Sequence, residues 1–228
     1  MHKCYLILIL SLLIAYSASA DSSPWELEIE DKDVDIAIYY RKHNSGNIEF
    51  RGIAKVRASL NSLVSLLSDV DSMPDWVYNI EQAKVLKKVS DVEAYTYVVN
   101  TTHFPFSKRD SIVHTIISQD SSTLSVTING QSVPDYIPES PDYVRLTLVK
   151  SFWQFKPLEN GMVEVIFQGM GEPGGSIVAD ISHSKVFHWI SKKLLWELPM
   201  ISLKNMKQEI RKSKYHNKKY DFIREPVK

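Results

Sequence analysis

Apolar and polar residues alternate with a period of two along much of the chain, and this pattern predicts β-strands. The first two strands, Val34 to Arg41 and Asn47 to Arg57, flank the turn Asn44-Ser45-Gly46, which is a hairpin signal. The later strand-like runs are Ala83 to Val89, Val92 to Thr102, Ser111 to Ser118, Thr123 to Ile128, Tyr143 to Phe155 and Met162 to Gln168. Most connections are too short for crossover helices, so we expect an antiparallel sheet.

Two other segments have the periodicity of a helix. The first runs from Leu60 to Val70, with Leu60, Leu63, Val64 and Leu67 on one face, and Pro74 starts a further turn that carries Trp76. The second runs from Ser182 to about Arg211, where Pro199 marks a kink or a restart. With no internal repeat or low-complexity linker, the pattern predicts one α+β domain.

The last predicted helix has two faces of different character. One apolar stripe, about 80° wide at 100° per residue, contains His183, Phe187, Ile190, Leu194, Leu198 and Ile201. The opposite face carries Lys185, Trp189, Lys192 and Trp196. Tryptophan beside lysine suits the headgroup zone of a membrane, and the alternative is that both tryptophans pack on neighbouring loops.

The N-terminus has the organisation of an export signal. Lys3 precedes the apolar run Tyr5 to Tyr16, and Ala18-Ser19-Ala20 forms a small-residue cleavage site. We expect residues 1–20 to be removed and the mature chain to be soluble and periplasmic, or secreted as the alternative. The apolar run is shorter than the roughly 20 residues that span a bilayer. Cys4 lies before this run, which disfavours a lipid anchor.

Composition narrows the function classes. The chain of 228 residues is 44% hydrophobic, with 27 basic and 27 acidic residues, which is typical of a globular protein and argues against disorder or nucleic-acid binding. Cys4 is the single cysteine, so the mature chain holds no disulfide, thiolate zinc site or iron–sulfur cluster. We expect no metal and no cofactor.

Charge is distributed unevenly along the chain. Asp21 to Asp35 contains seven acids and one lysine, whereas Lys204 to Lys219 contains seven basic residues and one glutamate. These segments are solvated faces, attract each other, or, for the basic one, attract anionic lipid. We draw the domain from residue 21 to residue 213 and a basic tail from 214 to 228.

Most enzyme signals fail on inspection. Gly169 to Gly174 matches G-x-G-x-x-G, but Pro173 removes an amide donor and no apolar strand follows to complete a dinucleotide-binding unit. No G-x-S-x-G motif occurs, and the histidines lack metal-binding spacing. What remains is a predicted sheet rich in aromatic residues on both faces: Tyr95, Tyr97, Phe152, Trp153, Phe155 and Phe167.

The order of these elements, together with five local motifs, resembles the StAR-related lipid-transfer (START) family. The motifs are Phe50-Arg51-Gly52, Pro74-Asp75-Trp76-Val77, Phe104-Pro105-Phe106-Ser107-Lys108-Arg109-Asp110, Val144-Arg145 and Glu172-Pro173-Gly174-Gly175. The resemblance covers roughly Trp25 to Arg211. It implies a helix-grip fold, in which a curved sheet holds the C-terminal helix around a hydrophobic tunnel. It departs from the cholesterol-carrying members at Thr115, where those proteins resemble one another in having an arginine.

The resemblance implies a monomer that binds one lipid-like molecule, contacts membranes transiently and performs no catalysis. The residues we expect at the lipid are Trp76, Tyr97, Arg109, Arg145, Trp153, Phe167, His183, Phe187, Ile190 and Leu194. Structural roles compete for several of them. Arg145, for example, needs either a carboxylate or a ligand oxygen once it is buried. The alternatives for the whole protein are a polyketide cyclase or aromatase and a lipid sensor or chaperone that does not transfer.

Overall fold

The computed structural model describes the backbone of residues 22–102, 107–172 and 185–227, and the side chains of the same residues except 185–195. The described residues form a ten-stranded sheet in the order β1-β2-β3-β10-β9-β7-β6-β5-β4, with β8 paired to β6 outside this path. The strands are β1 (Glu26–Asp31), β2 (Ile36–Lys42), β3 (Ile48–Arg57), β4 (Ile80–Ser90), β5 (Glu93–Asn100), β6 (Arg109–Gln119), β7 (Val126–Ser132), β8 (Val144–Arg145), β9 (Val149–Pro157) and β10 (Met162–Gly171). All pairings along the path are antiparallel, as expected, and the short β6–β8 pairing is parallel.

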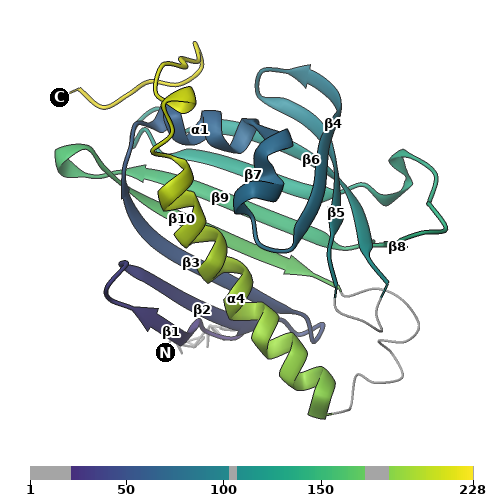
Figure 1. Ribbon diagram of the computed structural model, residues 1–228. Helices are drawn as coiled ribbons and strands as arrows, with labels where there is room; N and C mark the ends of the chain where they lie inside the picture. Colours follow the sequence, from purple (N-terminus) through teal and green to yellow (C-terminus); the bar gives the residue numbers. More distant parts are fainter. Residues whose placement is uncertain (1–21, 103–106, 173–184, 228) are drawn as a thin grey trace, which may run out of the picture.

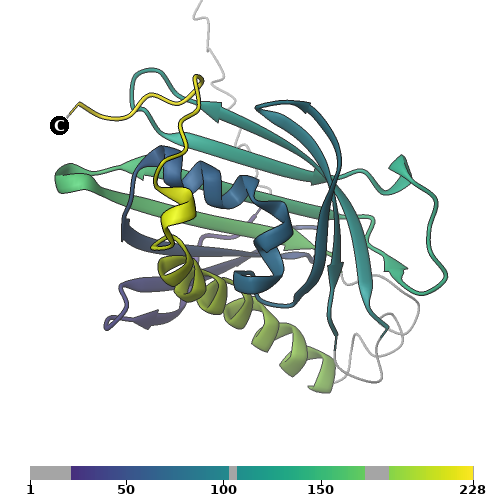
Figure 2. The same cartoon turned by 45° about the horizontal axis from the view of Figure 1, so that its top comes forward.

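The helices cover one face of this curved sheet (Figures 1 and 2). They are α1 (Leu60–Ser68), α2 (Met73–Trp76) and α4 (Lys185–Glu209). The chain leaves β3, crosses with α1 and α2, and enters β4 at the far edge of the sheet. After β10, α4 lies across β2, β3 and β10. The expected curved antiparallel sheet with a C-terminal helix is therefore confirmed.

The strand register shows which side chains face the helices. Phe50 and Ala54 of β3 and Val165 and Phe167 of β10 belong to the main core cluster under α1 and α4. We call this helix-covered face the concave face and the other one the outer face. Because successive strand residues point to opposite sides, Phe155 and Trp153 of β9 also face the concave side.

The absence of a side chain at Gly52 lets α4 approach the sheet closely. A Cβ atom at this position would lie 2.6 Å from Leu203 Cδ1 and 3.2 Å from Pro199 Cβ, both in α4. Pro199 and Leu203 are buried. The glycine of the Phe50-Arg51-Gly52 motif thus serves as the contact point for the C-terminal half of the helix.

The C-terminal residues pack on the domain. Tyr215 and Ile223 are 1% and 7% exposed and join the main core. The Glu225 carboxylate accepts hydrogen bonds from the first two backbone N–H groups of α1, Leu60 at 3.1 Å and Asn61 at 2.8 Å. The segment drawn from the sequence as a basic tail therefore contributes core and helix-capping contacts.

The oppositely charged ends of the chain attract each other, one of the alternatives left open by the sequence. Lys204 Nζ lies 2.8 Å from the Asp31 carboxylate, and Lys207 Nζ donates to the Val34 carbonyl at 2.6 Å. Further along, Lys214 pairs with Asp69 at 2.9 Å. Several charges of the basic run are thus occupied within the fold.

Candidate functional site

An aromatic cluster forms the floor of the concave face. Trp153 and Phe167 are direct cross-strand partners, and their rings stack with centroids 3.9 Å apart. Phe50 meets Phe167 edge to face at 5.0 Å, and Trp76 meets Trp153 edge to face at 5.9 Å. Trp76, Trp153 and Phe167, three of the residues expected at the lipid, are therefore brought together under the helices.

The C-terminal half of α4 holds the backbone around Trp76 in place by hydrogen bonds. Its carbonyl accepts a hydrogen bond from Asn205 Nδ2 at 3.1 Å, and the neighbouring Tyr78 N–H donates to Ser202 Oγ at 3.0 Å. The Trp76 side chain is 1% exposed, and its indole N–H is one of two buried side-chain polar atoms in the described residues that have no hydrogen-bond partner. The other is the Ser65 hydroxyl.

The concave sides of β5 and β6 are only partly covered. Ile117 pairs with Ile128 and packs on the main core, so Val113 and Thr115, in the same register, face the concave side too. Both are partly exposed, as is Val98 of β5 on the same side. Thr115 therefore offers a hydroxyl to the concave face at the position where the resemblance pointed to an arginine in other members. This partly exposed apolar and hydroxyl surface of β5 and β6 is called the open wall below.

Arg109 lies at the start of β6 and shares the register of the open wall. Its side chain is partly buried and donates to the Ser107 carbonyl. Burial lowers the pKa of this guanidinium. Arg109 thus places a positive charge at one end of the wall, and its role at a ligand stays a prediction.

Tyr97 and Arg145 are placed away from the concave face, which corrects their expected position at the lipid. Tyr97 packs with Val99 and Ile112 in a second, separate cluster on the outer face. Arg145 donates to Asp110 and to the carbonyls of residues 134, 137 and 138. All five N–H donors of the guanidinium have protein acceptors, so Arg145 has the carboxylate it needed and no donor left for a ligand.

Trp196 differs from its expected place on the membrane-facing side of α4. It is partly buried and packs against the main core, next along the helix to the buried Pro199 and Met200. Trp196 therefore packs against the protein, which was the alternative to a position facing the membrane. His183 lies outside the described residues. The side chains of the other helix residues expected at the lipid or membrane also lie outside them: Lys185, Phe187, Trp189, Ile190, Lys192 and Leu194.

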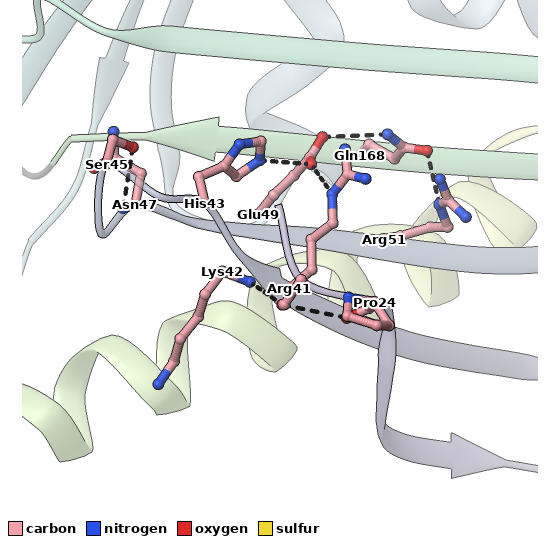
Figure 3. A network of polar contacts seen from close by, with 10 residues as sticks. Pro24, Arg41, Lys42, His43, Ser45, Asn47, Glu49, Arg51 and Gln168 are labelled. Atoms are coloured by element: carbon pink, nitrogen blue, oxygen red, sulfur yellow. Dashed lines mark hydrogen bonds and ion pairs between the residues drawn. The ribbon is translucent and has the colours of Figure 1, made fainter. Parts of the chain in front are cut away.

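The outer face carries a polar network that sequence reasoning missed (Figure 3). Glu49 accepts hydrogen bonds from Arg41 Nε at 2.6 Å and from Gln168 Nε2 at 3.3 Å, and His43 Nε2 lies at 3.1 Å. Arg51 Nε donates to Gln168 Oε1 at 2.8 Å. Despite the cost of burial, these partners lower the pKa of Glu49. No local sequence motif predicts this network, because its residues come together only when β2, β3 and β10 pair.

Two of the pockets among the described residues lie along the sheet strands. The larger, about 400 Å³, is lined by residues that include Glu49, Lys150 and Gln168. Neither pocket includes a residue expected at the lipid. Within the described residues, no group of histidine, cysteine and acidic side chains has a geometry that holds a metal ion. Among the described helices, none combines the length and apolarity that a membrane span requires.

A curved antiparallel sheet that grips a C-terminal helix over an aromatic, partly uncovered face defines a helix-grip module that binds hydrophobic ligands. The chain belongs to the START domain family, whose model matches residues 15–197. A STAR-related lipid transfer protein from Xanthomonas axonopodis is similar in structure, with a TM-score of 0.71 at 27% identity over 82% of this chain and 99% of that one.

Two further relatives extend this similarity. Human STARD10 shares the fold, with a TM-score of 0.68 at 15% identity over 83% of this chain and 74% of that one. A protein of Pseudomonas aeruginosa, the uncharacterized protein PA1579, is 25% identical over 163 residues, which are 72% of this chain and 75% of the relative.

Proposed function

We propose that this protein binds one hydrophobic, lipid-like molecule on the concave face and carries it between membranes. The single observation that carries the proposal is the open wall. Val98, Val113 and Thr115 face the helices yet remain partly exposed, on the same face of the sheet as the aromatic cluster of Trp76, Trp153 and Phe167. The membership in the START family and the similarity to a lipid transfer protein support the same function.

The energetics of lipid exchange explain why an apolar chamber is sufficient. A chain of about 16 methylenes costs on the order of 13 kcal/mol to expose to water, at about 0.8 kcal/mol each. A closed concave site removes most of that cost without any chemical step. We therefore propose a carrier that needs no catalysis, with Arg109 as the polar contact at the end of the open wall.

We propose that α4 is the lid and that it moves about an anchored C-terminal half. The anchors are the contacts of Pro199 and Leu203 with Gly52, and the hydrogen bonds from Tyr78 to Ser202 and from Asn205 to Trp76. Trp189 with Lys185 and Lys192 would then meet the membrane during exchange. The protein acts as a monomer in this proposal.

We also propose that the protein is exported before it functions. This rests on the apolar run and the small-residue cleavage site that end at Ala20. N-terminal sequencing of the exported protein should give a chain that begins at or near Asp21. A full-length cytoplasmic product would contradict export and the carriage of lipid between exported compartments.

Filling the open wall provides the central test of binding. Thr115→Trp projects a large ring into the concave side, whereas Ile116→Trp, the neighbouring residue on the outer face, is the matched control because Ile116 is 45% exposed. Native mass spectrometry should show one lipid per wild-type and Ile116→Trp chain and little or none on Thr115→Trp. Equal loading of all three folded proteins would place the ligand elsewhere.

Transfer is tested separately from binding. Fluorescent lipid in donor vesicles should reach acceptor vesicles faster with wild-type protein than without it, and Thr115→Trp should remove the acceleration. Stoichiometric binding without any acceleration would instead select a lipid sensor or chaperone.

A further inference from the structure

The indole N–H of Trp76 is a strong hydrogen-bond donor that the described protein leaves unused. The side chain is 1% exposed, and in the part of the chain that the structure describes no acceptor lies within hydrogen-bond reach of its nitrogen. Buried polar groups are nearly always paired, because an unpaired one loses its bond to water and gains nothing in return. The exception therefore points to an acceptor that arrives from outside the chain.

Only a molecule on the concave side can bring that acceptor. Trp76 ends α2, which packs on β4, while its ring reaches the Trp153 ring of β9. In the sheet order, β5, β6 and β7 lie between those two strands. The ring therefore lies on the concave face, in the main core cluster against which Ile117 of β6 also packs, and bulk solvent does not reach it.

The aromatic neighbour is a poor substitute for an oxygen acceptor. Trp76 and Trp153 meet edge to face with an interplanar angle of 65° and centroids 5.9 Å apart. Contacts between a donor and a ring face are much weaker than an N–H···O bond. An oxygen that enters the site would thus be favoured over the Trp153 ring as a partner.

The surroundings also limit the charge of this oxygen. Trp153, Phe167 and Phe50 provide apolar rings on this side, and burying a phosphate or carboxylate among them would carry a large desolvation cost. An ester carbonyl or a hydroxyl carries a smaller cost and accepts one N–H bond well.

We infer that the Trp76 indole N–H donates a hydrogen bond to an uncharged oxygen of the bound lipid, so that the site selects ester- or hydroxyl-bearing lipids over plain hydrocarbons. This inference rests on the proposed lipid-binding function and names the ligand class. Trp76 is then a residue that determines specificity among the apolar rings of Trp153, Phe167 and Phe50.

The test compares two guests of equal chain length, methyl palmitate and octadecane, which differ by one ester group. Competition against a bound fluorescent fatty ester should show tighter binding of methyl palmitate to the wild-type mature chain. Trp76→Phe, which keeps an aromatic ring and removes the N–H, should weaken methyl palmitate about tenfold and leave octadecane unchanged. Ser65→Ala removes the other unpaired buried polar atom and should preserve the wild-type preference.

An NMR measurement keeps the inference testable if Trp76→Phe folds poorly. In the wild-type protein labelled with ¹⁵N, the indole proton of Trp76 should move downfield when methyl palmitate is loaded and stay in place with octadecane. An unchanged signal with bound ester, or an equal preference in Trp76→Phe, would overturn the inference. If neither guest nor any extracted lipid binds, the proposed function itself fails.

Discussion

Asp110 and Arg145 form a two-pronged ion pair on the outer face of the sheet, with Nε–Oδ1 and Nη2–Oδ2 distances of 2.9 Å each. The side chains are 1% and 2% exposed. The pair joins the start of β6 to β8, and the remaining guanidinium donors hold the carbonyls of the 134–138 loop. Arg145, which the sequence led us to expect at the lipid, thus pairs with Asp110 and fastens a loop over the outer face.

Removal of the Asp110 carboxylate should destabilise the fold strongly. Asp110→Ala leaves the buried Arg145 charge without its counter-ion, and breaking such a pair costs about 3–5 kcal/mol. Urea unfolding followed by circular dichroism measures the loss. Asp91→Ala, which removes an exposed pair with Lys88, is the control and should cost under about 1 kcal/mol. A loss of lipid binding by folded Asp110→Ala protein, without a loss of stability, would contradict the structural role.

The order of the elements could be predicted because alternation and turn signals are local. The strands around Asn44-Ser45-Gly46 and the helix that begins at Leu60 agree with the structure within a few residues. β1 was missed, because the acids of Glu26–Asp31 mask a strand that forms by pairing with β2. The predicted strand from Tyr143 to Phe155 is divided into β8 and β9.

The sequence predicts the aromatic residues of the candidate site only in part, because it does not say which face of the sheet each strand residue points to. Trp153 and Phe167 lie on the concave face, whereas Tyr97 lies on the outer face with Ile112. Strand alternation separates residues into two sets, but the set that faces the helices depends on the register with β6 and β7. The partners of Arg145 were equally hidden, because the carbonyls of the 134–138 loop carry no sequence signal.

Adding a methyl group at Gly52 should push α4 away from the sheet. The new Cβ would lie 2.6 Å from Leu203 Cδ1 and 3.2 Å from both Pro199 Cβ and Ile38 Cδ1. Overpacking of this kind costs about 1–3 kcal/mol. Thermal and urea unfolding of Gly52→Ala measure the loss.

A double-mutant cycle with Leu203→Ala identifies the clash as the cause. Leu203→Ala alone should destabilise through a cavity, but it removes the atom that the new methyl group meets. The double variant should therefore be more stable than the sum of the two single losses predicts. Strict additivity would show that Gly52 matters for another reason.

The Glu225 side chain should stabilise α1 from the far end of the sequence. Its carboxylate accepts from the Leu60 and Asn61 backbone N–H groups and from Asn61 Nδ2 at 2.8 Å. Glu225→Ala removes these bonds at the helix N-terminus and should cost about 1–2 kcal/mol. Hydrogen exchange should become faster at the Leu60 and Asn61 amides, while Lys218→Ala, an exposed residue of the same segment, should leave both unchanged. Unaltered exchange in Glu225→Ala would show that the C-terminal segment does not cap this helix.

Tyr97 should give the fold a specific sensitivity to high pH. Burial, reinforced by the neighbouring Asp110 charge, raises the pKa of Tyr97 from 10.0 to about 12. The folded protein therefore keeps the phenol proton up to about pH 12, whereas the unfolded chain releases it from about pH 10. This contribution to stability is complete below pH 10 and is lost as the pH rises to 12, by about 2–3 kcal/mol.

Tyr97→Phe has no proton to lose at this position. Urea unfolding between pH 9 and about 11.5 should therefore show a smaller decline in the free energy of unfolding for this variant than for wild type. Tyr136→Phe is the control, because Tyr136 is exposed in the 134–138 loop, and it should retain the wild-type decline in stability. Equal declines in Tyr97→Phe and wild type would show that the outer-face cluster does not hold this proton.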